Sequence, residues 1–203
     1  MTVEAVPMPH RMKQRVVQEY SDMFLIDDLI ETGTYAGEMI DACRYFFKSI
    51  VSIELSRPHY EEASKLFSGR RYIRLYHGDS GAVLPEILKQ VAAPRVFWLD
   101  GHYSGESTAK GELNTPILKE LDAIFSHEVL SHVILIDDAR CFNGEDDYPA
   151  LSDLEIEVRR RRPDLAWSVR DDIIRIHTLR RPSSPGKRIR QKLVRKARSW
   201  SRR

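Results

Sequence analysis

Acidic residues follow five apolar segments of the chain. They are Glu31, Glu54, Asp79, Asp100 and the adjacent pair Asp137–Asp138. Carboxylates accept hydrogen bonds from ribose hydroxyls, and several of them together can ligate a hard cation such as Mg²⁺. If the apolar segments are parallel strands, their carboxyl ends meet at one edge of a sheet, which is where such sheets bind ligands. We therefore expect these acids to form one site.

A glycine-containing loop follows the first apolar segment and reads Glu31-Thr-Gly33-Thr34-Tyr-Ala-Gly37. Glycine lets the backbone turn sharply and approach a ligand closely. A dinucleotide-binding loop would read GxGxxG with an acid about 20 residues further on, but the order here is ExGxxxG. We expect the loop, Thr34 included, to bind a nucleoside cofactor whose ribose hydroxyls reach Glu54. A tight turn without a ligand is the alternative.

Asp79 and Ser80 close the third apolar segment in the sequence His77-Gly-Asp79-Ser80. On a parallel sheet this turn would lie beside the nucleoside site, so we expect both residues to meet the adenine or its neighbouring backbone. A simple polar turn is the competing interpretation.

The remaining acids, Asp100, Asp137 and Asp138, would repel one another at adjoining strand ends unless a cation neutralised them or a pKa rose. Three carboxylates suit Mg²⁺ or Mn²⁺. Such an ion acidifies a bound hydroxyl and holds its oxygen in place, which makes it a nucleophile. His102 follows Asp100 by two residues and is a candidate general base or further ligand. Alternatively, these aspartates only begin loops.

The elements that must position these residues alternate regularly. The pattern predicts strands near 29–30, 50–54, 72–76, 96–99 and 133–136, with helices over 12–22, 38–47, 60–67, 83–91, 116–125 and 151–158. Segments 167–169 and 173–177 form a hairpin across Asp171-Asp172. We predict a Rossmann-like, doubly wound α/β fold: a mostly parallel sheet with helices on both faces and a C-terminal antiparallel hairpin.

Composition limits the class of protein. The chain has 203 residues, 42% of them hydrophobic and 31% charged, which fits one globular domain over residues 1–180. Two cysteines, Cys43 and Cys141, stand outside any metal-binding motif, and no apolar run approaches the roughly 20 residues that span a bilayer. We expect a cytoplasmic protein.

The C-terminus differs from the body in charge. A Pro/Ser/Gly linker at 181–186 precedes a tail at 187–203, and residues 181–203 carry ten basic residues and no acid. The body, 1–180, has 22 basic and 30 acidic residues, a net charge of −8. Ile189, Leu193, Val194, Ala197 and Trp200 fall on one helical face. The pattern is typical of an amphipathic helix on an anionic membrane surface, here the inner one. There are three alternatives: a solvated tail, docking on an acidic subunit, and nucleic-acid contact, which we consider the weaker case.

Residues 20–178 resemble class I S-adenosylmethionine-dependent methyltransferases in the order of these motifs. The carboxylate pattern is similar to that of the Mg²⁺-dependent catechol and macrolide-sugar O-methyltransferases. The resemblance implies that Asp100, Asp137 and Asp138 hold the metal and that the acceptor is a small molecule with a hydroxyl, such as a sugar. The catechol-type enzymes use a lysine as base, and Lys110 does not match the spacing of that lysine. The rivals are a metal-independent methyltransferase, a membrane-associated binding protein and a nicotinamide-dependent dehydrogenase.

Overall fold

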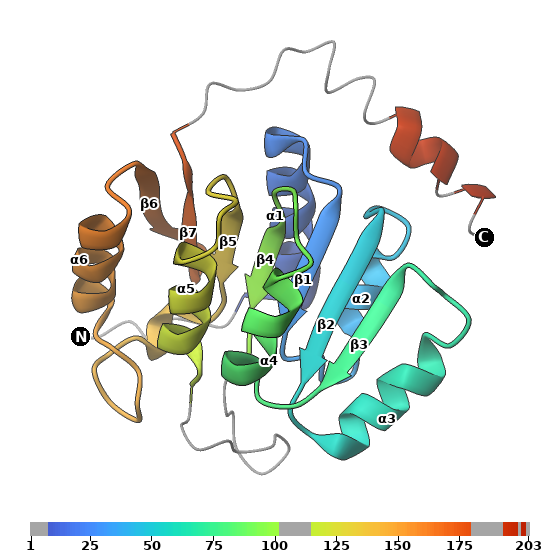
Figure 1. Ribbon diagram of the computed structural model, residues 1–203, viewed down its shortest axis with the longest axis horizontal. Helices are drawn as coiled ribbons and strands as arrows, with labels where there is room; N and C mark the ends of the chain where they lie inside the picture. The colour runs from blue at the N-terminus through green and yellow to red at the C-terminus, as the bar shows by residue number, and fades with distance from the viewer. Residues whose placement is uncertain (1–7, 102–114, 180–192, 199, 202–203) are drawn as a thin grey trace.

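A seven-stranded sheet forms the centre of the computed structural model, which describes residues 8–101, 115–179, 193–198 and 200–201 (Figure 1). The strand order is β3-β2-β1-β4-β5-β7-β6. The strands are β1 (Asp28–Thr32), β2 (Ser49–Glu54), β3 (Ile73–His77), β4 (Val96–Leu99), β5 (Val133–Ile136), β6 (Leu165–Arg170) and β7 (Ile173–Thr178). The first five are parallel, whereas β7 runs antiparallel to both β5 and β6. The predicted fold class is confirmed.

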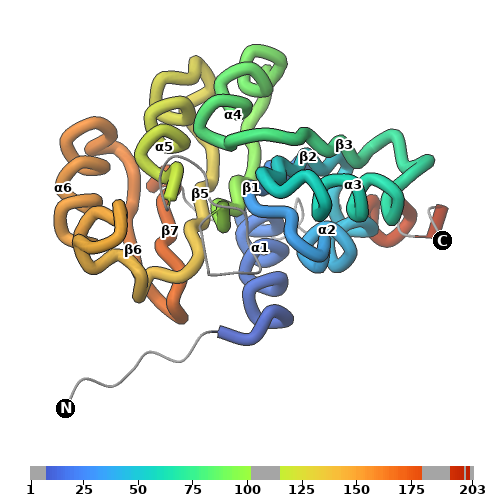
Figure 2. Tube along the Cα trace, turned by 90° about the horizontal axis from the view of Figure 1, so that it is seen from below, coloured from blue at the N-terminus to red at the C-terminus, as the bar shows by residue number. Residues whose placement is uncertain are grey.

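Helices cover both faces of the sheet (Figure 2). They are α1 (His10–Phe24), α2 (Glu38–Cys43), α3 (Arg57–Leu66), α4 (Ser80–Leu88), α5 (Ile117–Phe125) and α6 (Leu151–Arg161), with a short 3-10 helix, η1 (Ala139–Cys141). The first three pack on one face and α4, α5 and α6 on the other, each side with its own apolar cluster. None of the helices in the described part of the chain is long and apolar enough to cross a membrane.

The inner strands explain the two clusters. All four residues of β4 are buried, and alternate side chains serve opposite faces because the side-chain period of a strand is two. Phe97 belongs to the cluster under α4 and α5, whereas Trp98 belongs to the cluster under α1 and α2. An apolar strand between two helical layers thus completes both cores.

Several helix boundaries differ from those predicted, and two of them bear on the site. The helix expected over 38–47 ends at Cys43. The helix expected over 83–91 begins three residues earlier, at Ser80, because Asp79 caps it by accepting a hydrogen bond from the Gly81 N–H at 2.7 Å. Pro85 consequently lies inside α4 and not in its first turn.

The C-terminal segment is helical where it is described, at 193–198, 200 and 201, and it docks on the body through a cation. Arg195 is 4% exposed. Its guanidinium bonds to Asp22 and to Asp27, the latter with Nε–Oδ1 at 2.9 Å, and lies 4.0 Å above the centre of the Phe46 ring. These partners stand before β1 and β2, so the helix packs at the amino ends of the strands.

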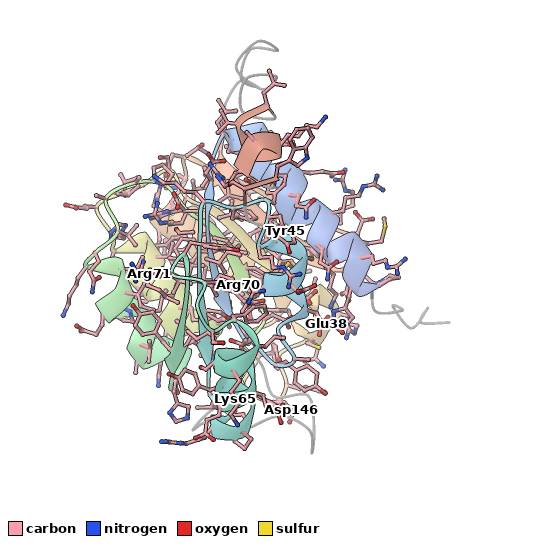
Figure 3. The ribbon with its side chains drawn as sticks, turned by 90° about the vertical axis from the view of Figure 1, so that its right-hand side faces the viewer. Glu38, Tyr45, Lys65, Arg70, Arg71 and Asp146 are labelled. Atoms are coloured by element: carbon pink, nitrogen blue, oxygen red, sulfur yellow. The ribbon has the colours of Figure 1, made fainter. Side chains whose placement is uncertain are left out.

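The apolar residues of this C-terminal helix point away from the body. Leu193 is 63% exposed, Val194 49% and Trp200 70%. In Figure 3 the helix lies at the end of the molecule opposite to Lys65 of α3 and to Asp146. In the described residues the apolar side chains of this helix are thus exposed and Arg195 lies on the inner side. An amphipathic helix over the whole of 187–203 stays a prediction. The linker at 181–186 lies outside the described residues.

Candidate functional site

The acids expected at the strand ends lie along one edge of the sheet. Backbone bonds extend the parallel ladder to them: the Asp100 N–H donates to the Thr32 carbonyl and the Asp137 N–H to the Leu99 carbonyl, both at 3.0 Å. One carboxylate oxygen from each of Asp100, Asp137 and Asp138 lies within 4.8 Å of the others. We call these three residues the carboxylate trio. The parallel register of β1, β4 and β5 is what brings them together.

The backbone conformation at Gly33 and Gly37 favours glycine, and protein atoms fill the space that a Cβ would occupy at each position. Both have positive φ, +82° and +75°. A Cβ on Gly33 would stand 2.3 Å from the Asp100 carbonyl oxygen, and one on Gly37 would stand 2.7 Å from the Phe67 ring. We predicted from the sequence that these glycines let a ligand approach the backbone closely. The structure shows that Gly33 lets the loop after β1 pack against the end of β4. Contact of Gly33 and Gly37 with a cofactor stays a prediction.

Glu54 fastens this loop to the end of β2. Its Oε2 accepts a hydrogen bond from the Tyr35 N–H and its Oε1 one from the Ser56 N–H, both at 2.8 Å. Each oxygen of a carboxylate has two acceptor sites, so one on each remains for another donor such as a ribose hydroxyl. A hydrogen bond from a ribose hydroxyl to Glu54 stays a prediction, and the part of Glu54 in shaping the loop was not foreseen.

Glu31 is enclosed within the sheet, not at its surface. It is 1% exposed, and its Oε2 accepts a hydrogen bond from the Ser52 hydroxyl at 2.6 Å. The Ser52 and Thr34 hydroxyls also lie 2.6 Å apart, so β1, β2 and the loop share one buried polar chain. Burial raises the pKa of Glu31 to about 8, although the hydrogen bond from Ser52 opposes the shift.

Asp79 and Ser80 have partners inside the protein. Asp79 caps α4, and Ser80, which is buried, donates its hydroxyl to Glu120 of α5 at 2.6 Å. These bonds fix where the turn after β3 meets the α4–α5 layer. Contact of Asp79 or Ser80 with a nucleoside stays a prediction.

Two basic side chains contact the trio within the described part of the chain. Lys13 of α1 pairs with Asp137, and its Nζ also lies 3.3 Å from Asp138. Arg140 donates to Asp138 at 2.7 Å and also pairs with Asp172. Burial, followed by the charge of Asp138, raises the pKa of Asp137. The trio is thus a buried cluster of negative charge that already holds cationic groups.

Lys13 was not foreseen as a site residue, although the sequence contained a signal. The buried positions of α1 include Lys13, Val16, Val17, Tyr20 and Phe24, which follow helical spacing. A lysine in the apolar stripe of a helix needs a buried acid as its partner. His102, the candidate base, and Lys110 lie outside the described residues.

Comparisons by sequence give no relative: no protein-family model matches the chain, and no curated protein does. Solved structures do match its fold. The SAH-bound methyltransferase PaMTH1 from Podospora anserina is 16% identical with a TM-score of 0.60, and the match covers 85% of this chain and 80% of that one. The O-methyltransferase TomG from Streptomyces achromogenes, involved in tomaymycin synthesis and solved with SAM, is 14% identical with a TM-score of 0.59, covering 82% and 79%.

A nucleic-acid-modifying enzyme shares the same architecture. The 23S rRNA methyltransferase ErmE is 13% identical with a TM-score of 0.54, and the match covers 91% of this chain and 75% of that one. At such identities the likeness concerns the fold and does not decide the acceptor. The chain has the α/β Rossmann-like fold of the S-adenosylmethionine-dependent methyltransferases.

Proposed function

We propose that this protein is an S-adenosylmethionine-dependent O-methyltransferase that acts on a hydroxyl of a small polar acceptor such as a sugar. One observation carries the proposal: a single sheet edge holds both the Glu54-bound glycine loop and the carboxylate trio. The first is suited to a nucleoside with free ribose hydroxyls, and the second to an acceptor hydroxyl. Holding both at one edge would bring donor and acceptor into line for transfer.

The donor half consists of the loop between Gly33 and Gly37 together with Glu54. Exposed Tyr35 lies at the rim of this loop, and its backbone N–H is held by Glu54. S-adenosylmethionine, when bound, supplies a methyl group activated by its sulfonium. Glu54 would accept hydrogen bonds from the ribose, and Asp79 with Ser80 would border the adenine.

The acceptor half centres on the carboxylate trio, whose donor set fits a hard divalent cation such as Mg²⁺ or Mn²⁺. Such an ion, when bound, would lower the pKa of an acceptor hydroxyl. Asp100 is less buried than Asp137 and Asp138. Of the three aspartates, Asp100 would therefore lie nearest to the hydroxyl of the methyl acceptor. His102 is proposed as the general base that takes the hydroxyl proton.

A metal-independent methyltransferase is the second candidate, because Lys13 and Arg140 already supply positive charge at the trio. The third candidate is a non-catalytic binding protein with this fold. It differs from the two methyltransferases because it would not bind S-adenosylmethionine. An RNA acceptor, as in ErmE, is disfavoured because three clustered carboxylates would repel phosphates.

We also propose that the C-terminal helix contacts an anionic membrane surface. Leu193, Val194 and Trp200 are exposed side by side with basic residues, and the segment from 181 onward carries no acid. Arg195 fixes this helix at the amino ends of the strands, whereas the trio lies at the carboxyl ends. The site would then face away from the lipid, in keeping with a water-soluble acceptor.

Binding of S-adenosylhomocysteine tests the donor half. Isothermal titration calorimetry of the full-length protein is expected to show binding, weakened at least about tenfold in Glu54→Gln because a charge-assisted acceptor is lost. Glu61→Gln, on the exposed face of α3, is the matched control and should bind like the wild type. Absence of binding by the wild-type protein would contradict the proposed function.

Binding of Mn²⁺, followed by the loss of the electron paramagnetic resonance signal of the free ion, tests the metal half. Asp100→Asn is expected to weaken binding about tenfold or more, because one anionic oxygen ligand is lost. Asp153→Asn changes an exposed acid on α6 and should leave the affinity unaltered. Equal affinity of the wild type and Asp100→Asn would place the metal elsewhere.

Co-sedimentation with vesicles tests the membrane contact. The full-length protein should pellet with phosphatidylglycerol vesicles and not with phosphatidylcholine vesicles, because eight basic residues in 181–203 remain after Arg195 and Arg198 pair with the body. Both truncation after Arg180 and the double substitution Leu193→Ser with Trp200→Ser should reduce pelleting. Equal pelleting of all three proteins would refute the contact.

A further inference from the structure

Lys13 stands at the centre of the negative cluster although it comes from the N-terminal helix. It is 7% exposed, and it reaches Asp137 and Asp138 across more than 120 residues of sequence. The neighbouring buried residues of α1 are mostly apolar and belong to the core. Helix α1 thus places one ammonium group, that of Lys13, beside the acids at the carboxyl ends of the strands. This position is defined by packing of the whole helix.

The ammonium of Lys13 is held by the acids. Burial favours the neutral amine, but the hydrogen bond to Asp137 and the charges of Asp137, Asp138 and Asp100 outweigh it and raise the pKa of Lys13. Arg140, the other cation, is more exposed and divides its bonds between Asp138 and Asp172. Within the described residues, Lys13 is therefore the cation that contacts Asp137.

Both oxygens of Asp137 are engaged in this arrangement. Oδ2 accepts from Lys13, and Oδ1 accepts from the Asp138 N–H at 2.8 Å. A divalent cation ligated by Asp137 would stand within a few ångströms of the ammonium, and like charges at that separation repel strongly in a buried setting. Each oxygen of Asp137 keeps a second acceptor site, but this repulsion makes the ammonium and a divalent ion compete for the carboxylate.

We propose that Lys13 is an exchangeable cation of the carboxylate trio: it neutralises Asp137 in the absence of a divalent ion and leaves Asp137 when one binds. The inference rests on the metal site of the proposed function and assigns α1 a part in it. Metal affinity is then set by competition with Lys13 as well as by the three ligands. Movement of Lys13 also couples metal binding to the seating of α1 on the sheet.

Removal of the competing charge should tighten metal binding. In full-length protein titrated with Mn²⁺ alone, Lys13→Met is expected to bind about tenfold more tightly than the wild type, because the repelling ammonium is gone while the acids remain. Lys89→Met, which removes an exposed lysine paired with Glu86 on α4, is the control and should match the wild type. Equal or weaker binding by Lys13→Met would overturn the proposal, and so would no Mn²⁺ binding by either protein.

A measurement on the wild-type chain covers the case in which Lys13→Met does not fold. Reductive methylation followed by mass spectrometry should label Lys13 poorly in metal-free protein and several-fold faster with saturating Mn²⁺, because a freed amine reacts more readily than an ion-paired one. Lys89 provides the internal reference. Unchanged labelling of Lys13 would refute the exchange. Calorimetry with S-adenosylhomocysteine on the same samples reports separately whether the donor half stands.

Discussion

The convergence of carboxylates at the buried edge of a parallel sheet is the constraint on which the rest of the structure depends. Parallel register brings Asp100, Asp137 and Asp138 to within one ligand shell of each other, and burial makes their mutual repulsion costly. Either a nearby cation or a raised pKa must relieve this repulsion. The structure meets this need with Lys13, and α1 is packed so that its one buried lysine arrives at this point. Helix α1, which covers one face of the sheet, therefore also supplies a cation to the carboxylate trio.

Much of this edge could be predicted from sequence because it depends on local patterns. Apolar runs of strand length end in acids, and a parallel sheet must align those ends, so the trio followed from topology. Asp79 illustrates the limit, because helix capping and ligand contact use the same residue type, and the cap that Asp79 forms with the Gly81 N–H was not foreseen. Gly33 illustrates it too: its need for positive φ was readable, but its neighbour, the Asp100 carbonyl, is 67 residues away.

Contacts across long sequence separations were beyond the sequence. The spacing of Lys13 within the apolar stripe of α1 signals a buried lysine, but only the packing of α1 on the sheet identifies Asp137 as its partner. The tail shows the same limit. Its amphipathic spacing was clear, but the burial of Arg195 against Asp22, Asp27 and Phe46 decides which side faces outward. As a result the two ends of the sheet differ: the carboxyl ends hold the carboxylate trio, and the amino ends hold the basic helix.

The central claim is that one position in the carboxylate trio is held alternately by Lys13 and by a divalent ion beside the donor loop. A crystal structure with S-adenosylhomocysteine and Mn²⁺, with data collected at the manganese absorption edge, tests it most directly. The account predicts an anomalous peak bounded by Asp100, Asp137 and Asp138, the Lys13 ammonium displaced from Asp137, and the ribose on Glu54. Nucleoside density elsewhere, or Lys13 still paired with Asp137 and no manganese at the trio, would contradict it.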